Sequence, residues 1–140
     1  AYPGALQEIL AADMIVVGPG SLFTSIIPNL LVRDIAAAIQ TSRAAKVYVC
    51  NVATQPGETD GFSMEDHLHA LDAHTGVELF PVVIVNLRQQ GRLLPDMDWI
   101  TTSEVSNGSR EIIMADVLDE EFPWRHDSSK IAEVLVRMLE

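Results

Sequence analysis

Short apolar runs alternate with amphipathic stretches along most of the chain. Residues 14–17, 46–50 and 81–85 are almost continuously apolar, a pattern typical of strands buried on both faces of a parallel sheet. Residues 111–115 have the composition of a fourth strand. We therefore expect a sheet of at least these strands, with both faces of the first three covered.

Amphipathic segments lie between and around these runs. Apolar positions spaced three and four residues apart predict helices at residues 3–12 and 35–40 and a C-terminal helix that begins after Asp127. A further helix has the clearest start, because Ser63 is a candidate N-cap with Asp66 three residues later, and Gly76 is its natural end.

Strands that alternate with helices predict βαβ units with right-handed crossovers. The predicted fold class is α/β, a three-layer parallel sheet with helices on both faces. With 140 residues, the chain suits one domain and leaves no room for a second.

Composition and charge narrow the function. Apolar residues make up 48% of the chain, as in a foldable globular protein. The net charge of -11 argues against general nucleic-acid binding, because an acidic surface repels a phosphate backbone. Cys50 is the only cysteine, which excludes an intrachain disulfide and agrees with a reducing cytosol. No stretch is long enough for a membrane span, and nothing resembles a signal peptide.

Candidate chemistry lies after the strands, because ligands of open parallel sheets bind beyond the carboxyl ends of the strands. The first predicted strand is followed by Gly18-Pro19-Gly20-Ser21, which could cradle a phosphate through backbone N–H groups and hydroxyls. It is neither a Walker loop nor a dinucleotide fingerprint, since no lysine follows and Phe23 replaces the third glycine. A tight turn without any ligand explains these glycines equally well.

The second predicted strand is followed by a long polar loop, residues 51–61. Long loops without secondary structure are more often functional than short ones. Gln55, Glu58, Thr59 and Asp60 could hydrogen-bond a sugar or a base, or Glu58 and Asp60 could hold a hydrated Mg²⁺. The alternative is a solvated turn with Pro56 and Gly57 at its corner.

The remaining reactive residue types give weaker signals. The spacing of His67, His69 and His74 does not suit a zinc site, so a surface or helix-packing role is expected for them. Cys50, at the end of a buried strand, is expected to be an inert core thiol. Arg125 precedes the N-cap residue Asp127 and offers a planar fork for a phosphate or carboxylate, although spacing alone favours a surface ion pair.

Four motifs together resemble the bacterial gluconeogenesis factor family, which is related to 2-phospho-L-lactate transferase. They are residues 12–31, ADMIVVGPGSLFTSIIPNLL; residues 47–51, VYVCN; residues 54–61, TQPGETDG; and residues 125–127, RHD. The resemblance covers most of residues 1–86 and the end of the chain. It departs from the family at residues 87–110, where relatives often carry a tyrosine and this chain has none.

The resemblance implies a cytoplasmic regulator that binds a nucleotide sugar similar to UDP-N-acetylglucosamine and is needed for growth on gluconeogenic carbon sources and for normal cell shape. It also implies that the chain is the C-terminal part of a Rossmann-like domain whose glycine-rich N-terminal part is absent. By resemblance, the site is lined by Gly18, Gly20, Ser21, Leu22, Asn51, Thr54, Glu58 and Arg125. Pro19, Gln55, Thr59 and Asn86 are further candidate ligand-binding residues, because they follow the carboxyl ends of the predicted strands.

Two other functions stay open. One is a transferase similar to 2-phospho-L-lactate transferase, in which Mg²⁺ would help to stabilise charge on the transferring phosphoryl group. The other is a structural domain without a ligand. For the preferred regulator we expect no catalytic residue, no metal site and no firm cofactor. The expected partner is a small nucleotide sugar or phosphoester, without nucleic acid, and a homo-oligomer is compatible with the sequence.

Overall fold

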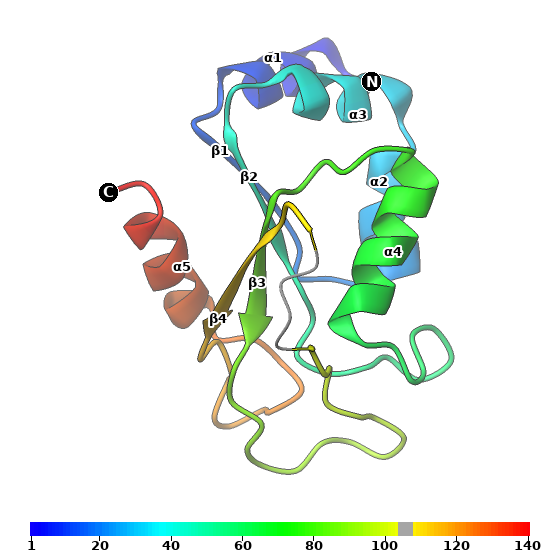
Figure 1. The fold of residues 1–140 in the computed structure, drawn as a ribbon, viewed down its shortest axis with the longest axis vertical. Coiled ribbons are helices and arrows are strands. Elements are labelled where there is room, and N and C mark those ends of the chain that lie inside the picture. Colours follow the sequence, from blue (N-terminus) through cyan, green and yellow to red (C-terminus); the bar gives the residue numbers. More distant parts are fainter. Residues whose placement is uncertain (104–107) are drawn as a thin grey trace.

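Four parallel strands form one sheet in the computed structural model, which describes residues 1–103 and 108–140. The strands β1 (Met14–Val17), β2 (Ala45–Val49), β3 (Val82–Asn86) and β4 (Glu111–Ala115) lie side by side in chain order. Every neighbouring pair is parallel. All four strands therefore end at the same edge of the sheet, at the bottom of Figure 1, where the long loops gather.

The predicted helices are all present. They are α1 (Pro3–Ala11), α3 (Arg33–Thr41), α4 (Met64–Thr75) and α5 (Ser128–Arg137). Ser63 and Asp66 form a reciprocal capping box at the start of α4, and Gly76 ends it with a φ of 75°. Asp127 caps α5 by accepting hydrogen bonds from the backbone N–H groups of Ser129 and Lys130.

One helical segment was not predicted. The loop after β1 enters a short π-helical turn, η1 (Leu22–Ile26), which continues directly as α2 (Ile27–Leu30). Leu22, Ile26 and Leu30 from this segment are buried, so it adds a layer to the core beside α4. The segment is short and contains Pro28, so its periodicity is too brief to be distinguished from a loop.

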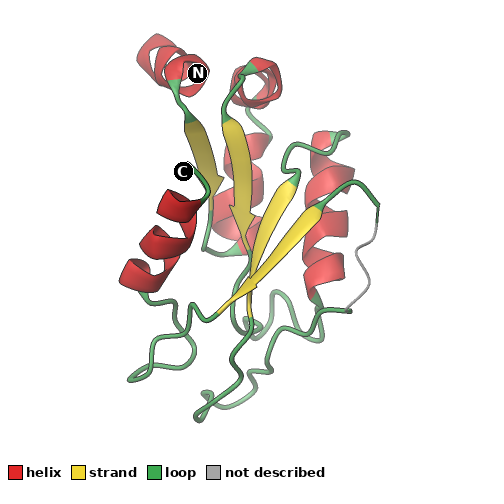
Figure 2. Cartoon of the chain, turned by 60° about the vertical axis from the view of Figure 1, so that its left-hand side comes forward, coloured by secondary structure: helices red, strands yellow, loops and turns green. Residues whose placement is uncertain are grey.

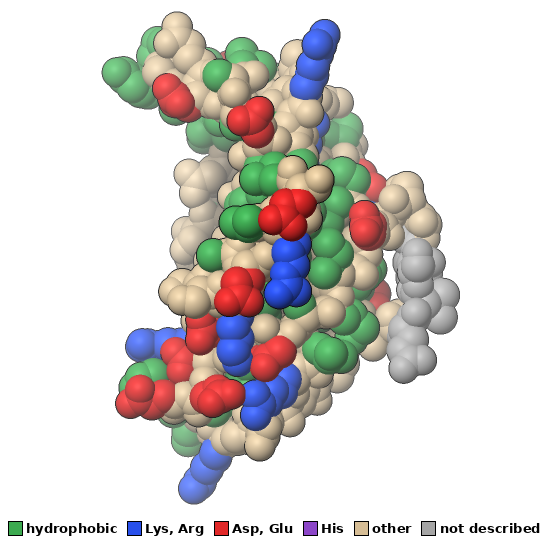
Figure 3. All heavy atoms as spheres, turned by 90° about the vertical axis from the view of Figure 1, so that its left-hand side faces the viewer, with side chains coloured by type: hydrophobic (Ala, Val, Ile, Leu, Met, Phe, Trp, Pro, Cys, Tyr) green, Lys and Arg blue, Asp and Glu red, His purple; other side chains and the backbone are tan. Residues whose placement is uncertain are grey.

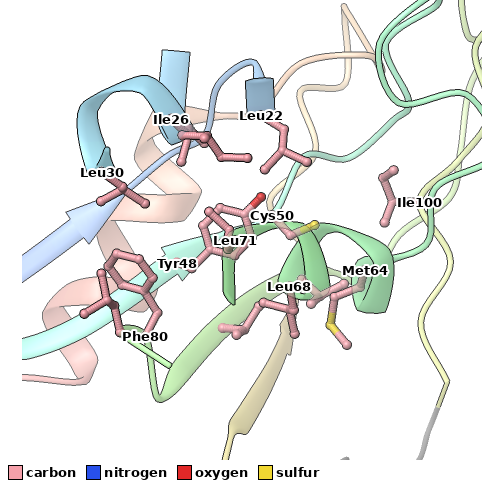
Figure 4. Close-up of a cluster of buried hydrophobic side chains, with 14 of the residues drawn as sticks. Leu22, Ile26, Leu30, Tyr48, Cys50, Met64, Leu68, Leu71, Phe80 and Ile100 are labelled. Carbon is pink, nitrogen blue, oxygen red and sulfur yellow. The ribbon is translucent and has the colours of Figure 1, made fainter. Parts of the chain in front are cut away.

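Helices cover both faces of the sheet, which confirms the three-layer α/β prediction. In Figures 1 and 2, α5 lies on one side of the sheet, and α2 and α4 lie on the other. The larger core cluster packs Tyr48, Val83 and Val85 against side chains of α2 and α4 (Figure 4). The smaller cluster packs Val47, Val49 and Ile84 against α5.

The prediction that the first strand is buried on both faces is wrong. β1 is an edge strand paired only with β2 in the described part of the chain, and Val16 is 39% exposed. An apolar run reports strand propensity, but burial depends on which strands lie on either side. β2 and β3, which are central, are fully buried over most of their lengths.

Across residues 1–103 and 108–140, no single helix has the length and hydrophobicity needed to cross a membrane, although the bent pair Leu22–Leu30 and Arg33–Thr41 meets both criteria when taken together.

Candidate functional site

A cleft opens at the carboxyl ends of β1 and β2. Its volume is about 350 Å³, within the lower range of small-molecule sites. The loop after β1, the loop after β2 and the segment before α5 contribute most of its walls. The lining residues are Pro19, Gly20, Asn51, Val52, Ala53, Gln55, Met97, Trp124, Arg125 and His126.

The glycine loop after β1 is held by the end of β2. Asn51 accepts a hydrogen bond from the Gly20 N–H at 3.2 Å and donates one to the Gly20 carbonyl at 3.1 Å. Gly18 has a φ of +87°, and a Cβ there would lie 2.6 Å from the Val49 carbonyl oxygen. Gly18 is therefore required by the fold. Gly20 has no positive φ, and a Cβ there would meet only ordinary contacts.

The loop after β2 crosses to the loop after β1. The Glu58 carboxylate accepts hydrogen bonds from the Phe23 N–H at 2.8 Å and from the Ser21 hydroxyl at 3.2 Å. The Gln55 amide nitrogen donates to the same hydroxyl at 2.8 Å. Three of the side chains predicted to bind a ligand thus contact one another, and of these Gln55 reaches the cleft.

Other predicted site residues are buried and already hydrogen-bonded. Thr54 accepts from the Asp98 N–H, and Thr59, which is fully buried, accepts from the Gln55 N–H. Asn86 accepts from the Val117 N–H and so links the ends of β3 and β4. Leu22 lies in the apolar core in Figure 4. These four side chains support the loops around the cleft without lining it.

The segment before α5 brings an aromatic and a cationic side chain to the cleft. The Arg125 guanidinium lies 5.3 Å from the centre of the Phe122 ring, and Phe122 makes an edge contact with Trp124 at 5.6 Å. Such cation–π contacts hold a guanidinium in place without neutralising it. Within the part of the chain that the structure describes, the ion pairs do not include Arg125. Arg125 is therefore a lining residue of the cleft whose charge has no ion-pair partner among the described residues.

His126 anchors this segment to the sheet. Its Nε2 lies 3.0 Å from the Cys50 carbonyl oxygen at the end of β2, so Nε2 carries the proton and donates. Burial lowers the pKa of His126, while the contact with the Cys50 carbonyl opposes that shift. The neutral imidazole leaves Arg125 as the only cationic side chain among the described residues that line the cleft.

Cys50 and the histidines of α4 have structural environments. The Cys50 thiol is fully buried, and burial raises its pKa to about 12, which confirms an inert core thiol. His67 is fully buried, and its Nδ1 donates to the Ser63 carbonyl at 2.7 Å. Its ring also makes an edge contact with Phe62, as expected for a helix-packing residue.

The carboxylates considered for Mg²⁺ do not converge. Glu58 faces Ser21 and Phe23, whereas Asp60 accepts from the Gly57 N–H at 2.7 Å. Among residues 1–103 and 108–140, no group of three or more His, Cys, Asp or Glu side chains is arranged to hold a metal ion.

Five cleft residues were missed from the sequence: Val52, Ala53, Met97, Trp124 and His126. Trp124 and His126 flank Arg125, so their proximity to a candidate residue was the available signal. Met97 had no such signal. It reaches the cleft because its segment pairs with residues 52–54, through the Ile100 N–H to the Val52 carbonyl and the Thr54 N–H to the Asp98 carbonyl.

The fold and the cleft together define a parallel α/β protein with a small-molecule cleft at the carboxyl ends of its strands, the usual ligand position in nucleotide-binding folds. The sequence model of the family described as 2-phospho-L-lactate transferase CofD matches residues 1–140. The chain belongs to this family.

Several relatives carry the name gluconeogenesis factor, in some cases provisionally. The provisional name belongs to a protein of Nostoc, 43% identical over 98% of this chain, and to one of Thermoanaerobacterium thermosulfurigenes, 44% identical over 97%. The full name belongs to a protein of Halalkalibacterium halodurans, 37% identical over 94% of this chain. The chain spans 32%, 45% and 44% of the lengths of these three relatives.

A crystal structure of a UPF0052 family member from Bacillus halodurans has the same fold. It superposes with a TM-score of 0.86 at 36% sequence identity, over 96% of this chain and 46% of that one. The architecture described above is therefore that of about half of a solved relative.

Proposed function

We propose that the chain is part of a cytoplasmic regulatory protein of the gluconeogenesis factor type, and that its cleft binds a nucleotide sugar similar to UDP-N-acetylglucosamine. The observation that carries this proposal is the presence in one cleft of Arg125, whose guanidinium has no ion-pair partner among the described residues, and of an aromatic side chain, Trp124. A nucleotide sugar offers a diphosphate for the first and a planar base for the second.

The polar residues that the loop after β2 contributes to the cleft suit the uncharged part of such a ligand. Asn51 and Gln55 are neutral amides, and both line the cleft from the loop after β2. Amide groups can both donate and accept, which matches the hydroxyls of a sugar. A nucleotide sugar would thus lie with its diphosphate toward Arg125 and its sugar toward Gln55.

The remaining walls of the site would come from a longer polypeptide. A cleft of about 350 Å³ is small for a whole nucleotide sugar, and the relatives are two to three times as long as this chain. An apolar groove also follows the open edge of β1, lined by Val16, Ile35 and Ile39, and it runs to the Gly18–Gly20 loop. We propose that the glycine-rich N-terminal part of the same domain covers this groove and completes the site.

We propose a regulatory role in growth on gluconeogenic carbon sources, which the relatives' names support, and in cell shape, which the family resemblance alone implies. The alternative is a transferase acting like 2-phospho-L-lactate transferase, which the family's description favours. That reaction would require Mg²⁺, whereas Glu58, the most central carboxylate of the two loops, is engaged by Ser21 and Phe23. We therefore prefer the regulator.

Calorimetric titration of the full natural polypeptide that contains these 140 residues separates the alternatives. The regulator predicts saturable binding of UDP-N-acetylglucosamine without turnover and without a need for Mg²⁺. Mg²⁺-dependent transfer of the phospholactyl group from a guanosine-activated phospholactate to an acceptor hydroxyl, with release of guanosine monophosphate, would favour the transferase. Binding of none of these ligands would leave a structural domain.

A further inference from the structure

Glu58 connects the two loops that form one wall of the cleft, but it does not line the cleft itself. Its carboxylate oxygens receive the Phe23 N–H at 2.8 Å and the Ser21 hydroxyl at 3.2 Å, both more than thirty residues away along the chain. Hydrogen bonds to a charged acceptor are about twice as strong as neutral ones. Glu58 is therefore a charged link between the loop after β1 and the loop after β2, in addition to the Asn51–Gly20 hydrogen bonds.

The link also determines where Gln55 lies. The Ser21 hydroxyl that donates to Glu58 accepts a hydrogen bond from the Gln55 amide at 2.8 Å. The Gln55 backbone is fixed at the same time, because its N–H donates to the buried Thr59 hydroxyl at 2.9 Å and its carbonyl receives the Glu58 N–H at 3.0 Å. The Ser21 hydroxyl also lies 3.1 Å from the Gln55 amide oxygen, so its proton can go to Gln55 or to Glu58, and the three side chains form one hydrogen-bonded group that positions Gln55 at the cleft.

The charge of Glu58 remains close to this wall. Among the residues that the structure describes, the ion pairs do not include this carboxylate. A negative charge behind Ser21 and Gln55 disfavours a phosphate on this side of the cleft and favours groups that donate hydrogen bonds. Arg125, on the segment before α5, supplies the opposite polarity in the same cleft.

We infer that Glu58 is a positioning residue that fixes Gln55 as the hydrogen-bonding wall for the uncharged part of the ligand and excludes phosphate from that wall. This inference rests on the proposed function, because it assigns the two ends of the same ligand. The inference goes beyond the proposed function because it predicts that Glu58 affects binding of the sugar and does not affect binding of the diphosphate.

The test compares two probes, UDP-N-acetylglucosamine and UDP, by calorimetry on the full natural polypeptide. Glu58→Ala should weaken UDP-N-acetylglucosamine binding about tenfold, as expected for the loss of hydrogen bonds to a charged group. Binding of UDP should stay within about twofold, because its contacts lie on the Arg125 wall. Glu58→Gln, which keeps the shape and one acceptor, should restore most of the affinity for the sugar nucleotide.

Asp60 supplies the matched control. It is a carboxylate of the same loop, but it is exposed and accepts only from the nearby Gly57 N–H. Asp60→Asn should leave both affinities unchanged. Equal weakening of both probes by Glu58→Ala, or no change in either, would overturn the inference.

Amide hydrogen exchange distinguishes a failure of this inference from a failure of the proposed function. The Phe23 N–H should exchange faster in Glu58→Ala than in the unchanged protein, whether or not a nucleotide binds. If the unchanged protein binds neither probe, the proposed function fails. Unchanged Phe23 exchange in Glu58→Ala would overturn the link between the loops on its own.

Discussion

At the residue scale, the two glycines of the loop after β1 have different roles. Both were predicted to line a site, and a structural turn was an equal alternative. The structure assigns the structural role to Gly18, whose φ of +87° and contact with Val49 admit no side chain. Gly20 borders the cleft and has room for a methyl group, with its nearest neighbours 3.8 Å and 3.9 Å from a Cβ.

This difference predicts opposite outcomes for the same substitution. Gly18→Ala should destabilise the protein by more than about 1 kcal/mol, since a positive φ alone costs about that much and the Val49 carbonyl adds a clash. Gly20→Ala should change stability by less than about 0.5 kcal/mol, because the added methyl group would meet the Ser25 and Ile26 side chains only at ordinary van der Waals distances. Thermal melts of both variants provide the comparison.

Two outcomes would contradict these predictions. If Gly20→Ala lowers the melting temperature as much as Gly18→Ala does, the absence of a side chain at Gly20 is also needed for the fold. If Gly18→Ala melts normally, the positive φ at that position is not needed for the fold.

At the element scale, helix α4 carries a histidine that should make the protein sensitive to acid. Burial lowers the pKa of His67 below its usual value of 6.5, and the nearby Ser63 carbonyl, Asp66 and Glu58 offset only part of that shift. The unfolded chain therefore binds more protons than the folded chain between the two pKa values. Stability is full above a pH of 6.5 and decreases as the pH falls through the lower, folded-state pKa.

We expect the free energy of unfolding to fall between about pH 7.5 and about pH 5.5, and to fall less in His67→Leu. His69→Leu is the matched control, because His69 lies on the same helix but is exposed. Urea unfolding of the three proteins at both pH values gives the slopes. Equal slopes in the wild-type and His67→Leu proteins would show that His67 does not titrate on unfolding. His126, whose pKa burial also lowers, contributes the slope that remains.

The elements themselves were largely predictable, and the reason is local. Periodicity and capping residues determine a helix such as α4, and Ser63, Asp66 and Gly76 identified both of its ends. The same is true of α5 and Asp127. The exposure of β1 and the segment Leu22–Leu30 could not be predicted, because the first depends on neighbouring strands and the second on packing against α4.

At the scale of the whole molecule, basic side chains lie among the acidic ones, although the net charge is -11. On the side that carries α5, acidic and basic side chains alternate in Figure 3. Asp116 there pairs with both Arg88 and Lys130, which joins the segments that follow β3 and β4 to the helix. These cations are neutralised, whereas Arg125 faces the cleft without an acidic partner among the described residues.

The candidate site was predictable in position but only partly in composition. Strand ends identified the loops that contain Gly20, Asn51 and Gln55, and the family resemblance identified Arg125. Met97 depends on pairing between segments more than forty residues apart, which no local pattern encodes. The mutual hydrogen bonds of Ser21, Gln55 and Glu58 likewise arise only when the two loops meet.

Arg125 is the proposed anion-binding residue of the cleft, and ligand binding should depend on it most. Arg125→Ala in the full natural polypeptide should weaken binding of UDP-N-acetylglucosamine about tenfold to a hundredfold, as expected when hydrogen bonds to a charged group worth about 1.5 to 3 kcal/mol are lost. Arg43→Ala, an exposed arginine between α3 and β2 at the opposite end of the strands, is the control and should bind normally.

Calorimetric titration with UDP-N-acetylglucosamine, together with thermal melts of the same three proteins, is the most direct measurement. The account predicts a large loss of affinity in Arg125→Ala alone, with a melting temperature close to that of the unchanged protein, because an exposed arginine contributes only about 0 to 1 kcal/mol to stability. Full affinity in Arg125→Ala together with a large fall in melting temperature would contradict it and show that Arg125 serves only to stabilise the fold.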